Sequence, residues 1–115
     1  MATYIVRKNH VISMVRGDYI NFEVEIPEEL ANLENNIYYF ILMYPNKTLE
    51  EAILIKEYEE LNSDNSLSIE LWPEDTELLV EGTYYYSIKV DSKETSESPT
   101  KTFTVIPNTK FFIVN

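Results

Sequence analysis

The sequence predicts an all-β domain, an antiparallel β-sandwich of about seven to nine short strands. Apolar and polar residues alternate in Tyr19–Ile26, Leu67–Trp72 and Thr83–Asp91, and this period of two is typical of strands with one buried face. Turn residues separate the apolar segments at short intervals, and little of the chain favours helix. With 115 residues, we expect a single domain that spans 1–115.

The first quarter of the chain is predicted to contribute up to three strands. Thr3–Arg7 and Val11–Val15 are short apolar segments that form either one kinked strand or two short ones. Arg16-Gly17-Asp18 is predicted to be a turn, because Gly17 adopts positive φ without steric cost. Tyr19–Ile26 then gives the clearest strand, with every second residue apolar.

The next segment is predicted to be a loop followed by a hairpin. Pro27–Asn36 is polar and acidic and suits a loop, whereas Ile37–Tyr44 is apolar on both faces and suits a central strand,. After a turn at Pro45–Lys47, Ala52–Tyr58 is interpreted as a charged edge strand. A helix over Leu49–Leu61 remains the alternative, because Glu, Leu, Ala and Lys favour helices.

The stretch from Leu67 to Val90 predicts the corner of an immunoglobulin-like sandwich. A strand ends at Pro73, and one short helical turn is expected near 73–79,. Gly82 ends that turn, and a Tyr-rich strand follows. Tyr84 stands where a corner tyrosine would donate its hydroxyl to upstream backbone, and Tyr86 stands where an antibody domain carries its second Cys,.

The C-terminal segment is predicted to be one strand and an apolar tail. Lys101–Ile106 suits a last core strand, and Pro107 is expected to end it,. The tail at 108–115 contains the apolar residues Phe111, Phe112, Ile113 and Val114. Because such a run is costly to expose, it should add a strand or form an interface; self-association or docking on a partner is the preferred interpretation.

Composition excludes several classes of function. Nine basic and twenty acidic residues give a net charge of −11, so neither nucleic acid nor an anionic membrane surface is expected as a partner. The chain has no Cys, which removes disulfides and thiolate metal sites. No secretory signal is visible at the N-terminus, so the protein is expected to be made in the host cytoplasm.

The sequence offers no assembled catalytic chemistry. His10 is the single His and lacks a nucleophile motif or a second metal ligand, so we expect no enzyme activity, no metal and no cofactor. Exposed together, Tyr19, Trp72 and Tyr85 could stack on sugar rings; the preferred interpretation is that they cover a sheet face or an interface.

Three segments carry a family resemblance: VRGDYINFEVEI, LSIELWPEDTELLVEGTYYYSIKV and KTFTVI. They resemble the small immunoglobulin-like domain of phage and prophage tail proteins, including the N-terminal domain of upper baseplate proteins. The matching motifs are the turn with Gly17 and Asp18, the turn that begins at Pro73, and the strand that begins at Gly82. None of them is catalytic.

The resemblance implies a non-catalytic structural or assembly module of a phage or phage-like particle, held by protein–protein contacts and able to form a homo-oligomer. A full baseplate protein would continue beyond residue 115 into shaft or receptor-binding parts. The alternative is a carbohydrate-binding or capsid-decorating module that contacts host surface sugar, and a cell-wall hydrolase is the more remote alternative.

Overall fold

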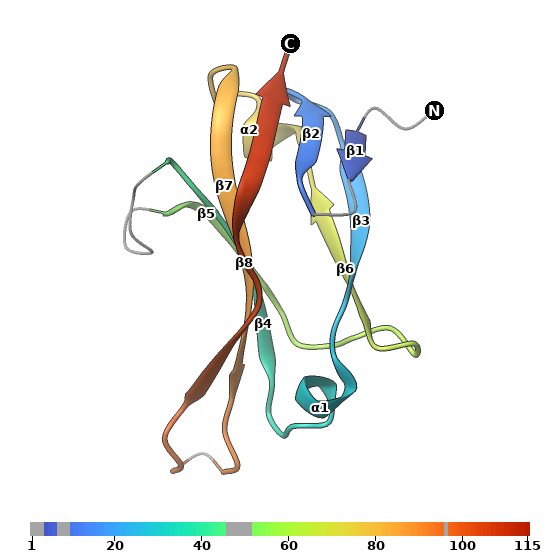
Figure 1. Ribbon diagram of the computed structural model, residues 1–115, viewed down its shortest axis with the longest axis vertical. Helices are drawn as coiled ribbons and strands as arrows, with labels where there is room; N and C mark the ends of the chain where they lie inside the picture. Colours follow the sequence, from blue (N-terminus) through green and yellow to red (C-terminus); the bar gives the residue numbers. More distant parts are fainter. Residues whose placement is uncertain (1–3, 7–9, 46–51, 96) are drawn as a thin grey trace.

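A computed structural model describes residues 4–6, 10–45, 52–95 and 97–115 (Figure 1). The ends of the first predicted strand at Thr3 and Arg7, and the turn at Asn46 and Lys47, lie outside these residues. The elements are β1 Tyr4–Val6, β2 Ile12–Val15, β3 Ile20–Glu25, α1 Glu28–Ala31, β4 Ile37–Met43, β5 Ala52–Tyr58, β6 Ser66–Leu71, α2 Pro73–Thr76, β7 Gly82–Ser92 and β8 Lys101–Val114.

The described strands form two layers around one core, which confirms the predicted β-sandwich class. One sheet has the order β1-β2-β8-β7-β4-β5, and the other pairs β3 with β6. Strands β8-β7-β4-β5 and β3-β6 occupy the places of strands G-F-C-C′ and B-E in an immunoglobulin sandwich. The interior is filled by the alternate apolar residues of both sheets, among them Phe22, Phe40, Ile69, Tyr86 and Phe111.

The large sheet is mixed, which corrects the prediction of a wholly antiparallel sandwich. The two N-terminal segments form separate short strands: β1 pairs antiparallel with β2, and β2 pairs parallel with the end of β8, with Ile12 opposite Phe111. Strand β2 and the last part of β8 run side by side in the same direction at the end of the sandwich where α2 lies (Figure 1). The other described strand pairs are antiparallel.

Strand β8 continues through Pro107, which corrects the prediction that Pro107 ends it. The register between β7 and β8 shifts between Tyr86 and Ile88: Tyr86 faces Thr109, whereas Ile88 faces Ile106. Two residues, Pro107 and Asn108, therefore oppose Ser87. Such a bulge leaves a residue out of the hydrogen-bond ladder and accommodates a proline that cannot donate.

The apolar tail is consequently part of this chain's own sheet. Phe111 is fully buried, Ile113 is 1% exposed, and both belong to the core. The expectation that these two residues form an interface is therefore wrong, because they lie on a strand of the chain's own sheet and are already buried in its core. Phe112 and Val114 alternate with them and point to the other face of the sheet, where Val114 is exposed.

Two predictions for the middle of the chain have opposite outcomes. The predicted loop at 27–36 contains a single helical turn, α1, so that prediction is wrong at Glu28–Ala31. Leu30 and Ala31 pack against the core from this turn, and two glutamates lie at its positive N-terminal end,. Residues 52–58, in contrast, form the predicted strand β5 rather than a helix.

The segment from β6 through α2 to β7 has the predicted strand, helical turn and strand order. Tyr84 is 3% exposed, and its hydroxyl donates to the carbonyl oxygen of Val80 at 2.6 Å, which is the backbone bond expected of a corner tyrosine. Tyr86 is buried and donates to the carbonyl oxygen of His10.

Helix α2 has four residues, and no helix in the described parts of the chain is long and apolar enough to cross a membrane.

Candidate functional site

Exposed large apolar side chains gather at the end of the sandwich where α2 lies. Eight such residues are exposed in the described chain, and only Leu33 and Ile55 lie elsewhere, on the α1–β4 loop and on β5. The others directly precede or follow α2, or are linked to these segments by ring contacts or hydrogen bonds: Tyr19, Tyr44, Trp72, Leu78, Val80 and Val114. We call the first five of these residues the α2 surface.

The centre of the α2 surface is the turn that joins α2 to β7. Leu78 is 90% exposed and Val80 is 69% exposed, whereas Leu79 between them packs against the core. Because Leu79 points toward the core, the side chains on either side of it in this short turn point toward solvent. Full burial of an aliphatic side chain is worth about 1.5–3 kcal/mol, so Leu78 and Val80 leave a substantial free energy available to a binding partner.

The aromatic part of the α2 surface begins with Tyr19 and Trp72. Their ring centroids lie 4.8 Å apart and their planes are inclined by 53°. The hydroxyl of Tyr19 donates to a carboxylate oxygen of Glu70 at 3.0 Å. The two rings are thus fixed against one another, on the outer side of the small sheet, with about half of each side chain still exposed.

A second aromatic pair lies on the other side of the turn. The rings of Tyr44 and Tyr84 are 5.7 Å apart, and the hydroxyl of Tyr84 holds the carbonyl of Val80. Tyr44 is 46% exposed, whereas Tyr84 belongs to the core. Tyr84 therefore connects the exposed residues Tyr44 and Val80 to the interior of the sandwich.

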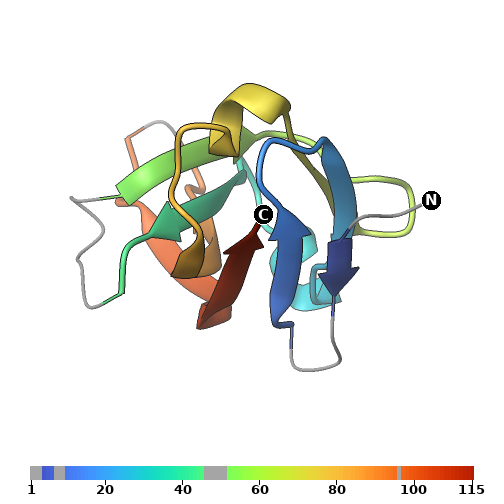
Figure 2. The same ribbon diagram turned by 90° about the horizontal axis from the view of Figure 1, so that it is seen from above.

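Helix α2 is anchored through the carboxylate of Asp75. The amide of Trp72 donates to a carboxylate oxygen of Asp75 at 2.7 Å, and the same oxygen lies 2.9 Å from the ammonium of Lys56 on β5. Figure 2 shows α2 between β5 and β3, which is where this ion pair joins the helix to the large sheet. The helix is therefore held in place before any partner binds.

The predicted Arg-Gly-Asp turn fixes the other side of the same segment. Gly17 has a φ of 79°, and its amide donates to the hydroxyl of buried Thr76 at 2.9 Å. Arg16 donates from its guanidinium to the carbonyl of Leu79 at 3.4 Å and from its amide to the carbonyl of Val114 at 2.8 Å. The backbone amide of Asp18 completes the turn by donating a hydrogen bond to the carbonyl of Val15 at 3.2 Å. This turn thus has structural contacts with α2 and β8.

Acidic residues surround the α2 surface. Glu70 contacts Tyr19, and Glu74, Glu77 and Glu81 are exposed on and after α2. Arg16 is exposed among them, and Lys56 is already paired with Asp75. The α2 surface therefore combines an apolar centre with a rim in which negative charge predominates.

The structure divides the predicted sugar-contact residues between two faces. Tyr19 and Trp72 lie together, but Tyr85 points away from the core, because its neighbours Tyr84 and Tyr86 point inward,. It therefore lies on the outer face of the large sheet, with Met43 and Lys110 as its cross-strand neighbours. The three aromatic residues form no common platform.

His10, the residue considered for catalysis, lies apart from any described nucleophile or metal ligand. It is exposed with a φ of 67°, and its described contact is the bond that its carbonyl accepts from buried Tyr86. Burial raises the pKa of Tyr86 to about 12, so its hydroxyl is a poor acid near neutral pH. In the part of the chain that the structure describes, no group of three or more His, Cys, Asp or Glu residues could hold a metal ion.

Sequence reasoning did not identify Leu78, Val80 and Tyr44 as surface residues. The available signal was the run Leu78–Val80 between Glu77 and Glu81, since a short turn next to a glycine cannot direct three apolar side chains into one core. Tyr44 carried no signal of its own, because it follows a continuous apolar strand.

Comparison of the chain with protein-family models, with curated proteins and with solved structures gave no significant match. The function therefore has to be argued from the geometry of the α2 surface and from the residues that carry the phage-tail resemblance.

Proposed function

We propose that this chain is a non-catalytic assembly module that binds another protein through the α2 surface. We propose that it belongs to a phage or prophage-encoded particle and lies in the tail or baseplate. This part of the proposal rests on the resemblance of the segments around Gly17, Pro73 and Gly82 to phage tail domains. The α2 surface adds a specific contact site to that proposal.

The observation that carries the proposal is the exposure of Leu78 and Val80 on a fixed platform. Exposed apolar patches on soluble domains mark interaction sites. Because α2 and its flanking turns are already held by Asp75, Thr76 and Tyr84, little conformational entropy is lost on binding. A rigid apolar centre of this kind is the typical anchor of a protein interface.

The charge around the α2 surface indicates the chemistry of the partner. Two copies of this chain that met through the α2 surface would bring Glu74, Glu77 and Glu81 of each copy close together, and like charges in an interface are unfavourable. A different protein with an apolar patch and a basic rim fits better. We therefore propose a heterologous partner of that kind rather than a homodimer through this surface.

The carbohydrate alternative uses the same aromatic pair. Sugar rings stack on broad, flat aromatic faces, whereas the planes of Tyr19 and Trp72 are inclined by 53° and Tyr85 lies on another face, which favours the protein partner. Titration with host cell-wall sugar, followed by the fluorescence of Trp72, separates the two. Saturable quenching would support the carbohydrate alternative, and release of soluble wall fragments would support the hydrolase.

The experiment that tests the proposal compares complexes formed in the native host. The tagged chain is expressed as wild type, as a Leu78→Ser/Val80→Ser double variant and as a Leu33→Ser control, whose exposed leucine lies at the α1 end. We expect wild type and control to recover the same stoichiometric partner, with a basic-rimmed surface, and the double variant to lose it. Equal recovery by all three proteins would overturn the proposal.

A further inference from the structure

The small sheet of the sandwich has outer edges that are open to another strand. In the described parts of the chain β3 pairs only with β6, whereas the corresponding sheet of an immunoglobulin constant domain contains the strands A, B, E and D. The places of strands A and D, on the outer sides of β3 and β6, therefore have no paired strand. An open strand edge presents amides and carbonyls that can bind an extended segment of another protein.

The hydrogen bonds between β3 and β6 determine which backbone groups reach each edge. The amide of Ile26, the residue after β3, donates to the carbonyl of Asn65, the residue before β6, at 3.1 Å. In an antiparallel pair, hydrogen-bonded residues alternate with residues whose backbone groups point outward. Val24 is therefore bonded to β6, and the amides and carbonyls of Glu23 and Glu25 point away from β6.

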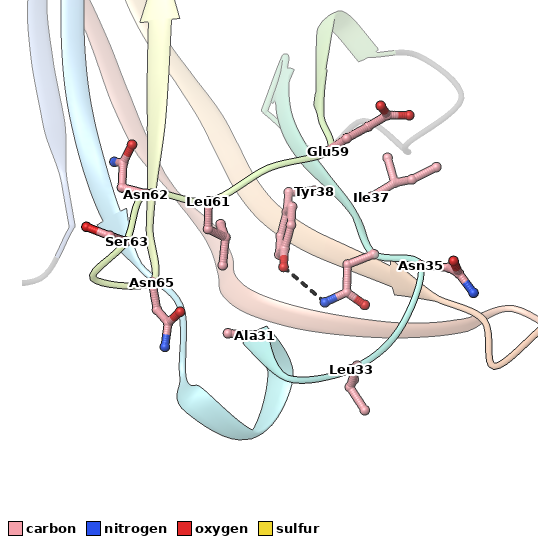
Figure 3. Close-up of a pocket in the computed structure, with 11 residues that line it drawn as sticks. Ala31, Leu33, Asn35, Ile37, Tyr38, Glu59, Leu61, Asn62, Ser63 and Asn65 are labelled. Atoms are coloured by element: carbon pink, nitrogen blue, oxygen red, sulfur yellow. Dashed lines mark hydrogen bonds between the residues drawn. The ribbon is translucent and has the colours of Figure 1, made fainter.

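The outer edge of β6 is partly covered by the chain itself. The amide of Glu70 donates to the hydroxyl of Tyr58 at 3.3 Å, and the amide of Ser66 donates to the carboxylate of Asp64 at 3.1 Å. The carbonyl of Ser66 accepts from the amide of Asn62 at 2.8 Å. Tyr58 and the β5–β6 loop therefore occupy places that an added strand would need. The same loop lines a cleft of about 710 Å³ with the α1–β4 loop (Figure 3).

The outer edge of β3 is free at Glu23 and Glu25. Neither the amide nor the carbonyl of these two residues has a hydrogen-bond partner in the described chain. Strand β1 lies beside the first part of β3 (Figures 1 and 2), but it pairs only with β2. The free part of the edge is therefore the second half of β3, towards α1. Its backbone groups have the spacing of a strand and fit an extended partner segment.

The core of the sandwich is least covered along this strand. Phe22 and Val24 are the most exposed of the buried residues in the core cluster, at 6% and 7%, whereas Ile20 at the start of the same strand is 1% exposed. Both side chains point inward, because they alternate with exposed Glu23 and Glu25,. A strand added along β3 would place its own inward side chains beside them, so apolar residues at those positions would be removed from water.

The outward side of the same edge is acidic. Glu23 and Glu25 are exposed, and Glu70 lies on the same face of the small sheet, opposite Asn21. In the described chain the carboxylate of Glu23 accepts a long bond of 3.4 Å from the side-chain amide of Asn62, and that of Glu25 has no described partner. Opposite charges on adjacent strands stabilise a pair of strands, and like charges destabilise it. Lys or Arg therefore suits the outward positions of an added strand.

From these observations we propose that the free edge of β3 binds an extended segment of another protein in which basic and apolar residues alternate. The backbone of the segment pairs with Glu23 and Glu25, its apolar side chains lie beside Phe22 and Val24, and its basic side chains face the two carboxylates. A second copy of this chain fits poorly, because a β3–β3 pair sets the glutamates of both copies against one another. This site is separate from the α2 surface and does not depend on its function.

The test is an NMR titration of the full chain with an acetylated and amidated peptide, Val-Lys-Val-Lys-Val-Lys-Val. Two comparison peptides carry Glu in place of every Lys, or Gly in place of every Val. We expect only the Val-Lys peptide to shift the backbone amide signals of Glu23 and Glu25 saturably. It should also slow the hydrogen exchange of these two amides by at least about tenfold, because they gain hydrogen bonds. The indole signal of Trp72 should stay unchanged.

Charge reversal at the edge provides the matched variants. Glu23→Lys/Glu25→Lys should weaken the Val-Lys peptide about tenfold or more and should bind the Val-Glu peptide instead. Glu59→Lys/Glu60→Lys changes the net charge equally at exposed positions after β5, and it should bind like wild type. The proposal is overturned if no peptide binds wild type saturably, if the Val-Lys and Gly-Lys peptides act alike, if the two amides stay unprotected, or if both double variants lose the Val-Lys peptide equally.

Discussion

The hydroxyl of Tyr84 donates a 2.6 Å hydrogen bond to the carbonyl oxygen of Val80, four residues earlier in the chain. Tyr84 is buried, whereas Val80 is exposed. The bond therefore connects the core of the sandwich to the proposed docking surface, and it sets the path of the α2–β7 turn. Stability and binding should both depend on this contact.

Removal of that hydroxyl tests the corner directly. Tyr84→Phe keeps the ring and leaves the Val80 carbonyl without its donor, so we expect the free energy of unfolding to fall by about 1 kcal/mol. Urea denaturation measures this change. Tyr85→Phe is the matched control, because the Tyr85 ring lies on the outer face of the large sheet, and it should change stability by less than about 0.5 kcal/mol. Equal effects of the two variants would contradict the corner assignment.

The two C-terminal phenylalanines should differ sharply in their contribution to stability. The ring of Phe111 is fully buried, with its centroid 6.3 Å from that of Phe40 and 6.0 Å from that of Tyr86, so Phe111→Ala should cost about 3–5 kcal/mol. Phe112→Ala, on the other face of β8, should cost about 1 kcal/mol. Sedimentation velocity of the wild type should also show a monomer. If the wild type is an oligomer and the Phe112→Ala variant is a monomer, the tail forms an interface after all, and this prediction is wrong.

Alkaline pH should destabilise the fold through its buried tyrosines. Burial raises the pKa of Tyr86 from 10.0 to about 12, and burial also raises the pKa of Tyr58 and Tyr84. Below pH 10 both folded and unfolded states keep Tyr86 neutral, so its contribution to stability is complete there. As pH rises from 10 towards 12 the unfolded state ionises first, and stability should fall by up to about 1.4 kcal/mol per pH unit for this residue.

Urea titrations of wild type and Tyr86→Phe at several pH values from about 8 to 11 check this dependence. The Phe variant should be less stable than wild type below pH 10, because the His10 carbonyl loses its donor, and it should have a shallower alkaline slope. Identical slopes for the two proteins would show that Tyr86 does not titrate as its burial requires.

The parts of the fold that follow from local patterning could be predicted from the sequence. Alternation identified β3, β6 and β7, and the Pro73 and Gly82 positions identified the corner with α2 between them. The helical turn at Glu28–Ala31 escaped prediction because four residues are too few for a helical period. The continuation of β8 through Pro107 depends on a bulge against Ser87, which arises from the pairing partner and not from the local sequence.

The candidate sites were harder to predict because they depend on residues that are distant in the chain. Tyr19, Trp72 and Tyr85 were considered together as a sugar contact, with cover of a sheet face or an interface preferred, but the separation of Tyr85 from the other two follows from the assignment of strands to two sheets. The free edge of β3 at Glu23 and Glu25 arises because β6 is its only paired strand in the described chain, and no pattern within β3 itself signals that.

The central claim is that the α2 surface is the contact site of an assembly module, and site-specific photo-crosslinking tests it most directly. A photoreactive amino acid replaces Leu78 in one protein and Leu33 in another, and each is irradiated in the native host after assembly. Binding through the α2 surface predicts one discrete adduct with a single partner protein from position 78 and none from position 33. The same adduct from both positions, or from position 33 alone, would contradict the claim.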